Sequence, residues 1–557
     1  MTKAKAARAA ATRELLFLPL GGAGEVGMNL SLYGCGGKWL MVDLGITFAG
    51  EVMPGVEVLM PDPAFIVERR DDLLGLVLTH AHEDHLGAVP YLWPRLKCPV
   101  YASPFTAAVL RPKLFEAGLA DQVDITEVPV GGAFDLGPFA LEFITLTHSI
   151  PESAALIIRT PAGAVLHTGD WKLDSGPLVG PVSDEAALNR LGEEGVLAMV
   201  CDSTNALRPG ESGSEAALRE SLIELVEGAK GRVVIACFAS NVARLETVAA
   251  VAAAHGRHAA LVGRSLWRIY EAARETGYLS EVAFLNDRDG GLLPRDKVLL
   301  ACTGSQGEPR SALARIGAGD HPHVALDPGD TVIFSSRIIP GNERAIFRLQ
   351  NQLVGLGVEV ISERTHFVHV SGHPNQDELM RMYQWVRPEV AVPVHGEGRH
   401  LAAHAELARA CQVPQVVVVE NGSLLRLAPG RAEIVEQVGA GRLALDGTEL
   451  IAVDGAVLKS RYRMARNGVA VATLVLDGGG RLAADPQLTV HGLLEAEGED
   501  EIKAEAIAAI RRAVEALPVE SLSDGERVRE AARLAVRRAF NESRGKRPLT
   551  EVHLVRL

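Results

Sequence analysis

The sequence predicts an α/β protein built from several domains, and three observations lead to this prediction. Short apolar segments end in a histidine, an aspartate or a glycine-rich turn, as strands do when the loops after them carry chemistry. These segments lie at 39–45, 75–82, 141–149 and 164–170. Between about 206 and 365, continuous apolar segments alternate with helical ones, which is typical of a mostly parallel sheet covered on both faces. The 557 residues are also enough for about three or four domains.

The expected elements divide the chain into five parts. Helices are expected where apolar residues recur at helical spacing, at 104–119, 214–229, 243–256, 376–387, 499–516 and 525–541. Further strands are expected at 231–240, 297–305, 330–336, 389–397 and 550–557, with a hairpin at 468–486. The parts are a flexible tail at 1–14, a first domain at 15–205, an α/β domain at 206–365, a segment at 366–449 and a small α+β domain at 450–557.

Composition restricts the class of protein further. With 47% apolar and 23% charged residues, the chain is expected to be globular. A net charge of −14 excludes a strongly basic nucleic-acid coat, although a local basic groove stays possible. The six cysteines are scattered without CxxC spacing, so we expect free thiols in a reducing cytoplasm. The N-terminus lacks the apolar core of a signal peptide, and no apolar run approaches the roughly 18 residues of a membrane span, so no membrane contact is expected.

The run HAHEDH at 80–85 is the clearest chemical signal. Imidazoles at alternate positions of a loop, His80 and His82, can both reach one divalent ion, while Asp84 and His85 project toward a second. Histidine makes up only 17 of the residues, so a chance H-x-H-x-D-H is expected roughly once per thousand such chains. A polar surface loop is the alternative, and the rarity of the run favours a dimetal site.

The run resembles the signature of the metallo-β-lactamase superfamily, whose fold is an αββα sandwich with metal ligands on loops at one edge of two sheets. The resemblance implies further ligands after other strands, where His148, Asp170 and His395 stand. It implies that one zinc ion is held by His80, His82 and His148, that the other is held by Asp84, His85 and His395, and that Asp170 bridges the two. Asp43 would orient the ligand loop. His167 lies within its strand and is interpreted as structural; a lone strand-end histidine is more often a hydrogen-bonded loop residue than a ligand.

The spacing of these residues indicates an insertion. Six of the implied ligands fall between 80 and 170 and the seventh is at 395, so residues 206–365 would be inserted into the sandwich domain and build a cleft over the site. This insertion resembles the β-CASP domain of metallo-β-lactamase nucleases, because Asp202 in CDSTN, His373 in HVSGH and His395 in VHGE match its three motifs. A histidine at the third motif is typical of the members that act on RNA, whereas DNA-repair members typically carry valine.

Motifs over nearly the whole chain resemble the bacterial ribonuclease J family, namely GGAGEVGMN, HAHEDHLG, CFASN, TGSQGEP and HVSGHP. The resemblance implies a metal-dependent ribonuclease with a metal-bridging hydroxide as nucleophile. It would act as a 5′→3′ exonuclease on single-stranded RNA with a 5′-monophosphate end and also as an endonuclease, in rRNA 5′-end maturation and mRNA decay. It implies two Zn²⁺ per subunit, with Mn²⁺ or Mg²⁺ possible in vitro. A homodimer or homotetramer through the C-terminal domain, and RNA-degradation or ribosome-associated partners, are implied as well.

The same resemblance assigns roles to single residues. The implied catalytic residues are Asp84, His85, Asp202 and His373, with His373 contacting the scissile phosphate and acting as general acid. The implied substrate-binding residues are His369, Val370, Ser371, Gly372, His373, Ser240 and Asn241. HVSGH could instead be a polar turn, and Ser240 and Asn241 could cap a helix. Candidates for a basic groove are Arg244, Arg264, Arg268, Arg310 and Arg337, although each is more commonly a solvated surface residue.

Two further points stay open at the sequence level. GGAGEVG is interpreted as a tight turn near the site, since no acidic partner for a dinucleotide ribose is apparent, and Glu25 is a weak candidate for a supporting role. Family members often carry an acidic stretch associated with structural Ca²⁺, but here 45–55 has Glu51 as its only carboxylate and Asp446 as a distant partner. Whether calcium binds is left open.

Three other functions are weighed against this one. A small-molecule metallo-hydrolase would leave the inserted domain and the SGH motif unexplained. A non-catalytic RNA-binding scaffold would leave the complete ligand set unexplained. A DNA nuclease of the same superfamily is disfavoured by His395 and can be separated by substrate choice. The sequence itself does not set the balance between exonuclease and endonuclease activity.

Overall fold

The computed structural model describes residues 14–49, 53–493 and 499–557 and separates into two compact units. The larger unit contains residues 59–441 together with the described residues up to 48, and the smaller one contains residues 442–557 together with the described residues of 49–58. The predicted tail at 1–14 falls outside the described residues except for Glu14. None of the helices in the described ranges combines the length and the apolar composition that crossing a bilayer requires.

Two sheets form the centre of the larger unit. The strand order of the first is β24-β23-β1-β3-β4-β7-β8-β9. Its strands are β24 (Glu433–Gln437), β23 (Ser423–Ala428), β1 (Leu15–Gly21), β3 (Leu30–Cys35), β4 (Lys38–Val42), β7 (Leu73–Val77), β8 (Val100–Ala102) and β9 (Ile125–Glu127). The order of the second is β10-β11-β12-β13-β14-β20-β22. Its strands are β10 (Ala133–Leu136), β11 (Phe139–Thr145), β12 (Ala154–Thr160), β13 (Gly163–His167), β14 (Ala198–Asp202), β20 (Val390–Val394) and β22 (Gln415–Val416).

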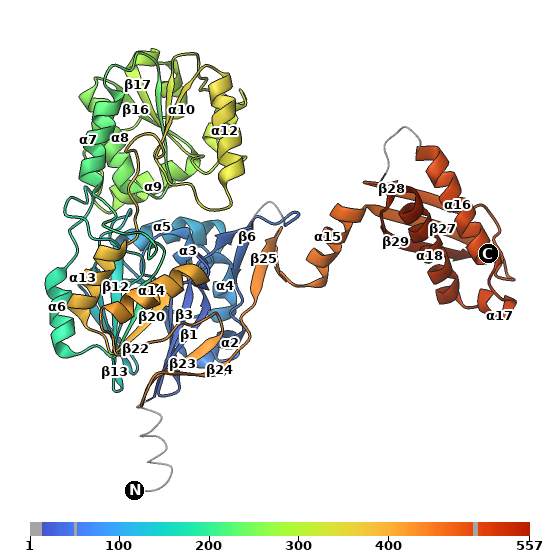
Figure 1. Ribbon diagram of the computed structural model, residues 1–557, viewed down its shortest axis with the longest axis horizontal. Helices are drawn as coiled ribbons and strands as arrows, with labels where there is room; N and C mark the ends of the chain where they lie inside the picture. Colours follow the sequence, from blue (N-terminus) through green and yellow to red (C-terminus); the bar gives the residue numbers. More distant parts are fainter. Residues whose placement is uncertain (1–13, 50–52, 494–498) are drawn as a thin grey trace, which may run out of the picture. The chain divides into compact units, whose positions relative to one another are not determined.

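Side chains from the facing surfaces of these sheets share one buried core, in which Phe17 and Tyr33 of the first sheet meet Phe143 and Val200 of the second. Helices cover the outer faces, so the layers form the αββα sandwich that was predicted (Figure 1). On one side lie α6 (Glu185–Glu194), α13 (Gln376–Val386) and α14 (Gly398–Ala410), which pack with the second sheet in a further core. The other helices of the sandwich are α2 (Ala64–Val67), α3 (Glu83–Leu86), α4 (Val89–Leu96) and α5 (Pro104–Glu116).

The pairing of β14 with β20 shows how the chain leaves the sandwich and returns to it. These strands are parallel neighbours, with Asp202 beside Val394, although nearly two hundred residues separate them. The intervening chain builds a separate five-stranded parallel sheet of order β16-β17-β15-β18-β19. Its strands are β15 (Val233–Ala236), β16 (His258–Val262), β17 (Val298–Cys302), β18 (Thr331–Phe334) and β19 (Glu359–Ser362).

Helices flank this inserted sheet as its sequence pattern predicts. They are α7 (Glu215–Val226), α8 (Val242–Ala254), α9 (Arg264–Glu275), α10 (Asp287–Leu292), α11 (Ala312–Gly317) and α12 (Glu343–Gly355). In Figure 1, α7 and α8 lie on one side of the sheet and α12 lies on the other. The side chains of Val234, Leu300 and Phe334 are among those that form its core.

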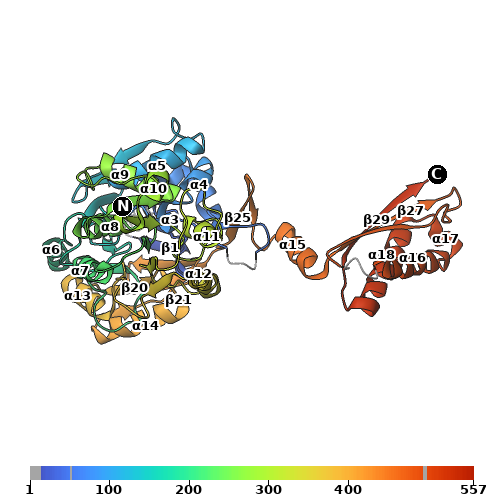
Figure 2. The same cartoon turned by 90° about the horizontal axis from the view of Figure 1, so that it is seen from above.

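The smaller unit holds a three-stranded sheet of order β28-β27-β29, whose outer strands pair antiparallel and parallel with the central one. Two long helices lie side by side against it (Figure 2), and Leu474, Ile510 and Phe540 are buried between them. Its elements are β25 (Arg442–Asp446), β26 (Glu449–Ala452), α15 (Ala456–Asn467), β27 (Val469–Leu476), β28 (Gln487–His491), α16 (Glu499–Glu515), α17 (Val519–Leu522), α18 (Gly525–Arg544) and β29 (Leu549–Arg556).

Two expectations about this part of the chain need adjustment. The hairpin predicted at 468–486 has its second strand at Gln487–His491, beyond the predicted range, because the turn after β27 is long. The calcium candidate Asp446 accepts a hydrogen bond of 2.7 Å from Arg461, so its carboxylate already has a cationic partner. Its proposed companion Glu51 lies outside the described residues.

Candidate dimetal centre

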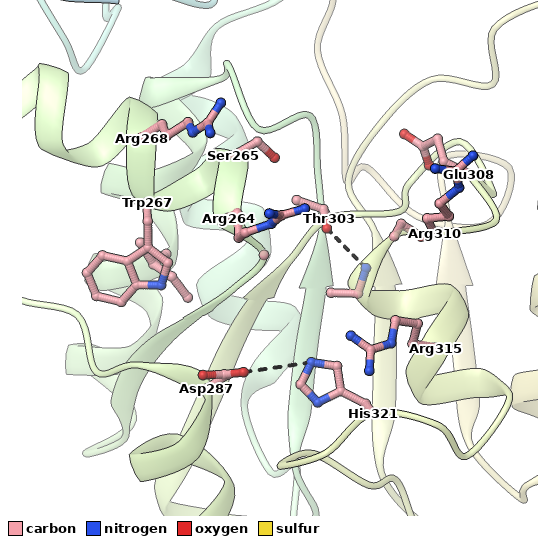
Figure 3. A pocket seen from close by; sticks show the side chains of 14 residues that line it. Arg264, Ser265, Trp267, Arg268, Asp287, Thr303, Glu308, Arg310, Arg315 and His321 are labelled. Atoms are coloured by element: carbon pink, nitrogen blue, oxygen red, sulfur yellow. Dashed lines mark hydrogen bonds and ion pairs between the residues drawn. The ribbon is translucent and has the colours of Figure 1, made fainter. Parts of the chain in front are cut away.

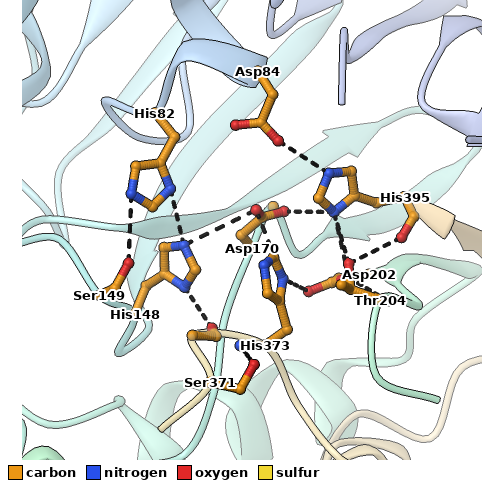
Figure 4. A network of polar contacts seen from close by, with 12 residues as sticks. His82, Asp84, His148, Ser149, Asp170, Asp202, Thr204, Ser371, His373 and His395 are labelled. Carbon is orange, nitrogen blue, oxygen red and sulfur yellow. Dashed lines mark hydrogen bonds and ion pairs between the residues drawn. The ribbon is translucent and has the colours of Figure 1, made fainter. Parts of the chain in front are cut away.

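The seven implied ligands lie in loops that follow strands at one edge of the sandwich. Four come from the loop after β7 and from α3, and the other three come from the loops after β11, β13 and β20. In chain order, the seven are His80, His82, Asp84, His85, His148, Asp170 and His395. Parallel pairing of β13 with β14 and of β14 with β20 brings the carboxyl ends of these strands to the same edge. The structure therefore gathers all seven side chains, and Figure 4 shows how the loops converge.

These side chains form two groups that share Asp170. In the first group, one ligand atom from each of His80, His82, His148 and Asp170 lies within 4.8 Å of the others. The second group meets the same limit and consists of Asp84, His85, Asp170 and His395. Asp84 Oδ2 lies 3.2 Å from His395 Nε2, and Asp170 Oδ2 lies 3.3 Å from His85 Nε2. A carboxylate shared between two ligand groups is an arrangement that suits a pair of divalent ions.

The close approach of these nitrogen and oxygen atoms is better explained by binding of metal ions than by hydrogen bonds among them. His82 Nδ1 lies 3.1 Å from both His80 Nε2 and His148 Nε2, so three imidazole nitrogens converge on one point. Asp170 Oδ1 is buried without a hydrogen bond in the part of the chain that the structure describes, with His395 Nδ1 3.1 Å away as its ion-pair neighbour. Imidazole nitrogens combined with carboxylate oxygens suit zinc and similar divalent ions. The cluster is therefore consistent with a dimetal site.

Burial sets the protonation of the histidines. Desolvation lowers the pKa of His82 to about 4, and desolvation together with neighbouring imidazoles holds the pKa of His80 and of His148 well below the usual range. The neutral imidazole is the form that binds a metal. Burial also disfavours the charged forms of His85 and His395, but the adjacent carboxylates outweigh it and raise the pKa of both.

Asp43 holds the loop that carries the HAHEDH run through hydrogen bonds. Its carboxylate accepts hydrogen bonds from the backbone N–H of Thr79, at 2.8 Å, and from His85 Nδ1, at 2.7 Å. The contact with His85 fixes which ring nitrogen carries the proton and leaves Nε2 directed at Asp170. Both Asp43 and His395 hold left-handed backbone angles, with φ of 62° and 52°, and such angles cost energy in residues other than glycine. Thr79 was not singled out from the sequence, although it directly precedes the HAHEDH run.

Asp202 and His373 lie beside the two groups. His373 Nδ1 is 2.8 Å from Asp202 Oδ2, and Thr204 donates a hydrogen bond of 2.7 Å to Asp202 Oδ1. Asp202 and His373 also form a third cluster with Asp170 and His395 that meets the same 4.8 Å limit, a possibility that the sequence analysis did not raise. The Asp202 contact engages Nδ1 of His373, so Nε2 is the ring nitrogen that this contact does not use.

The HVSGH segment packs directly against a predicted ligand. Gly372 contributes its carbonyl oxygen as acceptor for His148 Nδ1, and Ser371 Oγ accepts a hydrogen bond of 2.8 Å from Asn205. Val370 is 4% exposed, and a substrate role for it stays a prediction. Asn205 lies within the CDSTN motif, but the sequence pointed only to its aspartate. HVSGH is therefore anchored at the site and is not a free surface turn.

The close approach of Gly372 to His148 leads to a prediction. A Cβ atom at position 372 would lie 2.6 Å from His148 Cε1, so Gly372→Ala must displace the imidazole. We expect catalytic activity to fall about 10–100-fold, as it does when the orientation of a metal ligand is disturbed. The matched control is Gly398→Ala, where a Cβ meets nothing within 4 Å. If Gly372→Ala and Gly398→Ala had equal catalytic rates in a steady-state assay, the position of His148 would not affect catalysis.

His369 lies in a strongly basic environment. Burial lowers its pKa well below the usual range, and four nearby cations lower it further, namely Arg244, Arg337, Lys172 and Arg208. Its Nδ1 atom is buried without a hydrogen-bond partner among the described residues. Arg337 donates a hydrogen bond of 2.7 Å to Asn205 Oδ1, which connects this basic region to the HVSGH segment. Because Arg244 is paired with Glu215 and Lys172 with Asp174, an anion would be attracted here mainly by Arg208 and Arg337.

The structure agrees with some of the roles predicted for residues of the inserted domain and contradicts another. Asn241 is 5% exposed and accepts a hydrogen bond from the backbone N–H of Arg244, so the helix-capping interpretation is confirmed for Asn241. A substrate role for Ser240 and Asn241 stays a prediction. The placement of Arg244 in a basic groove is wrong, because its side chain is fully buried against Glu215 at 3.3 Å. The sequence gives no sign that these two residues face each other across neighbouring helices.

The remaining candidates near the centre have structural partners. In GGAGEVG, three glycines adopt positive φ angles, which confirms the tight turn, and Glu25 accepts a hydrogen bond from Asn421. His167 Nδ1 lies 2.9 Å from the hydroxyl of Tyr33 within the sandwich core, in agreement with its interpretation as structural. The six cysteines are free thiols, as expected.

Two packed sheets whose common edge gathers histidines and aspartates around a shared carboxylate define a metal-dependent hydrolase of the metallo-β-lactamase class. Four family models match the chain: the metallo-β-lactamase superfamily at 24–235, the ribonuclease J β-CASP domain at 230–353, the Zn-dependent metallo-hydrolase RNA specificity domain at 357–417 and the ribonuclease J C-terminal domain at 456–557. The chain belongs to the ribonuclease J family, which confirms the family that its motifs indicated.

Individual relatives agree with this assignment. The ribonuclease J of Sinorhizobium meliloti is 46% identical over 564 residues, covering 100% of both chains. That of Mycolicibacterium smegmatis is 40% identical over 536 residues, covering 95% of each, and that of Thermus thermophilus is 36% identical, covering 96% of this chain and 93% of the relative. A solved structure of a protein of unknown function from Enterococcus faecalis V583 shares the fold with a TM-score of 0.52 and 14% identity, covering 74% of this chain and 100% of that one.

Proposed function

We propose that this chain hydrolyses phosphodiester bonds in single-stranded RNA, as a 5′→3′ exonuclease that prefers 5′-monophosphate ends and as an endonuclease. The observation that carries the proposal is the pair of ligand groups sharing Asp170, with His373 held beside them by Asp202. Zinc ions bound there, or manganese or magnesium in vitro, would neutralise charge on the phosphate and activate water for attack. Family membership supports RNA as the substrate.

His373 is the residue placed to protonate the departing oxygen. Its Nδ1 atom is engaged by Asp202, so its Nε2 atom is free to reach the 3′-oxygen that leaves when the phosphodiester bond breaks. Thr204 holds Asp202 in place through the hydroxyl and the backbone N–H, at 2.7 and 2.8 Å. The side chain of His373 is 22% exposed, so a substrate can approach it. His80, His82, Asp84, His85, His148, Asp170 and His395 are proposed as the metal ligands.

The basic surroundings of His369 support a preference for a 5′-monophosphate. A terminal phosphate carries more negative charge than an internal phosphodiester, and it would gain from the nearby charges of Arg208 and Arg337. The backbone of Ser371 and Gly372 lies next to this region and can present N–H groups to phosphate oxygens. This local field lets a chain of net charge −14 attract RNA.

The proposal is tested with end-labelled RNAs that carry a monophosphate, a triphosphate or a hydroxyl at the 5′ end, and with single-stranded DNA. We expect the purified chain, supplied with zinc, manganese or magnesium, to release mononucleotides fastest from the monophosphate RNA. The double variant Asp84→Ala, His85→Ala should lose this activity because it removes half of one ligand group. Cleavage of the RNAs by this variant at the wild-type rate would refute the proposed centre.

A matched control and the alternative functions are read from the same assay. Asp121→Ala removes an exposed carboxylate outside both ligand groups and should leave the rate unchanged. Preference for DNA would favour a DNA nuclease, and absence of cleavage with every metal would favour a scaffold or a small-molecule hydrolase. Self-association through the C-terminal domain, partners in RNA degradation, a cytoplasmic location, and roles in rRNA maturation and mRNA decay are proposed on the family resemblance alone.

A further inference from the structure

The inserted domain contains a cavity of ≈ 660 Å³ that shares no residue with the dimetal centre. It opens where β16 and β17 end and where α9 and α11 begin, and Gly263 and Thr303 form part of its wall. A volume of this size falls within the range of sites that bind small molecules. Nothing in the proposed reaction uses this cavity.

The charges around the cavity favour an anion. Its lining holds four arginines, Arg264, Arg268, Arg310 and Arg315, against two carboxylates, those of Asp287 and Glu308, and burial lowers the pKa of His321, which also lines it. In Figure 3, the guanidinium groups of Arg264 and Arg315 point toward the same space from opposite walls. Asp287 lies 3.9 Å from His321. Because the whole chain carries a net charge of −14, this local excess of arginine is a distinct feature of the surface.

An aromatic side chain lies beside these cations. Trp267, from the first turn of α9, lines the cavity next to Arg264 (Figure 3). An indole offers a flat apolar face on which a nucleobase can stack, and arginine forms charge-assisted hydrogen bonds to phosphate oxygens. A ligand that combines a flat ring with a phosphate would use both, whereas inorganic phosphate would use only the arginines.

The cavity opens on the edge of the inserted sheet that faces the catalytic residues. β15, β16, β17 and β18 are parallel, so their carboxyl ends share one edge. On this edge Arg337, which follows β18, donates a hydrogen bond to Asn205, and Asn205 also donates to the carbonyl oxygen of His373 at 3.1 Å. Arg268 of α9 pairs with Glu116 of α5 in the sandwich, at 2.5 Å. The cavity thus lies where the inserted domain meets the sandwich.

We infer that this cavity is a second nucleotide site, which binds a phosphate through Arg264 and Arg315 and a base against Trp267. The nucleotide is either a downstream unit of an RNA strand whose 5′ end lies at His373 or a free nucleoside monophosphate. Only the first source rests on the proposed function. Both sources present the same chemistry, so the test separates them by the length of the probe.

The test compares the full-length, metal-loaded protein with the double variant Arg264→Gln, Arg315→Gln. The matched control is Arg344→Gln, Arg348→Gln, which removes two exposed arginines of α12 outside the cavity. The probes are nuclease-resistant phosphorothioate oligoadenylates of two and ten nucleotides with 5′-monophosphates, together with AMP and adenosine. Affinities are measured by calorimetry at several salt concentrations, and thermal melting checks that each variant is folded. If the double variant does not fold, Arg264→Gln alone replaces it.

For RNA as the source, we expect the cavity variant to bind the decamer about tenfold more weakly or worse, because two charge-assisted contacts are lost. The slope of log K against log salt should become less negative by about 0.7, the change expected when one phosphate of a single strand is no longer neutralised. The dinucleotide should show a much smaller change if the strand must extend several nucleotides from His373 to reach the cavity. The control variant should bind the decamer as the wild type does.

Other outcomes are equally decisive. If the cavity variant lost AMP binding but bound the decamer as before, the free nucleotide would be identified as the ligand. Adenosine, which lacks the phosphate, should then bind weakly to the wild type and to both variants. Unchanged binding of both AMP and the decamer, or equal losses in the cavity and control variants, would overturn the inference. If the wild type hydrolysed no RNA, the proposed function would fail, while the AMP measurement would still decide whether the cavity binds a nucleotide.

Discussion

Asp170→Asn is expected to lower kcat/KM for RNA at least about a thousandfold, the largest loss that we predict for a single substitution at this site. Asp170 is the only residue that belongs to both ligand groups, and it is 2% exposed. Asparagine keeps the shape of the side chain but removes the charge that balances the surrounding histidines. We therefore expect weaker binding at both metal positions, measured as bound metal per chain after dialysis.

The control for Asp170 is Asp135→Asn, which removes an exposed carboxylate from β10 of the same sheet. This control should keep both its metals and its activity. Retention of full metal content and full activity by Asp170→Asn would contradict the role of a shared ligand. Loss of only one metal ion would show that Asp170 serves one ligand group and does not bridge the two.

The fold and the cluster of ligand candidates could be predicted because local patterns specified them. A histidine or aspartate directly after an apolar strand is visible in the sequence, and parallel strands end at a common edge. The superfamily resemblance implied further ligands after other strands, and this context selected His148, Asp170 and His395, which the structure places beside His80 and His85. The insertion followed from the gap between the sixth and seventh of these residues.

The supporting contacts were not visible in the sequence because they depend on which elements pack together. Thr79 and Thr204 hold Asp43 and Asp202, but a threonine next to a functional residue has no pattern of its own. The cavity around Trp267 depends on the order of strands in the inserted sheet, which hydrophobic periodicity does not reveal. The sequence around a charged residue such as Arg244 also does not reveal whether a neighbouring helix will bury its side chain.

The pair formed by Arg244 and Glu215 leads to the second large effect, this time on stability. Glu215→Gln leaves a fully buried guanidinium without its carboxylate, since Arg244 and Glu215 are 0% and 1% exposed. Breaking a buried ion pair from one side costs about 3–5 kcal/mol of unfolding free energy. At about 2–4 °C per kcal/mol for a domain of this size, we expect calorimetry to show that the melting temperature falls by about 10 °C.

The double variant Glu215→Gln, Arg244→Met distinguishes the effect of losing the ion pair from the effect of leaving the buried charge of Arg244 without a partner. Removing both charges leaves no uncompensated buried charge, so the double variant should recover more than half of the lost melting temperature. Some loss should remain because Arg244 also donates a hydrogen bond of 2.8 Å to the carbonyl oxygen of Ser335. A double variant as unstable as Glu215→Gln would show that the ion pair is not the cause. Because the arginine is buried, the double variant should also bind RNA with the wild-type salt dependence, whereas a groove arginine would change it.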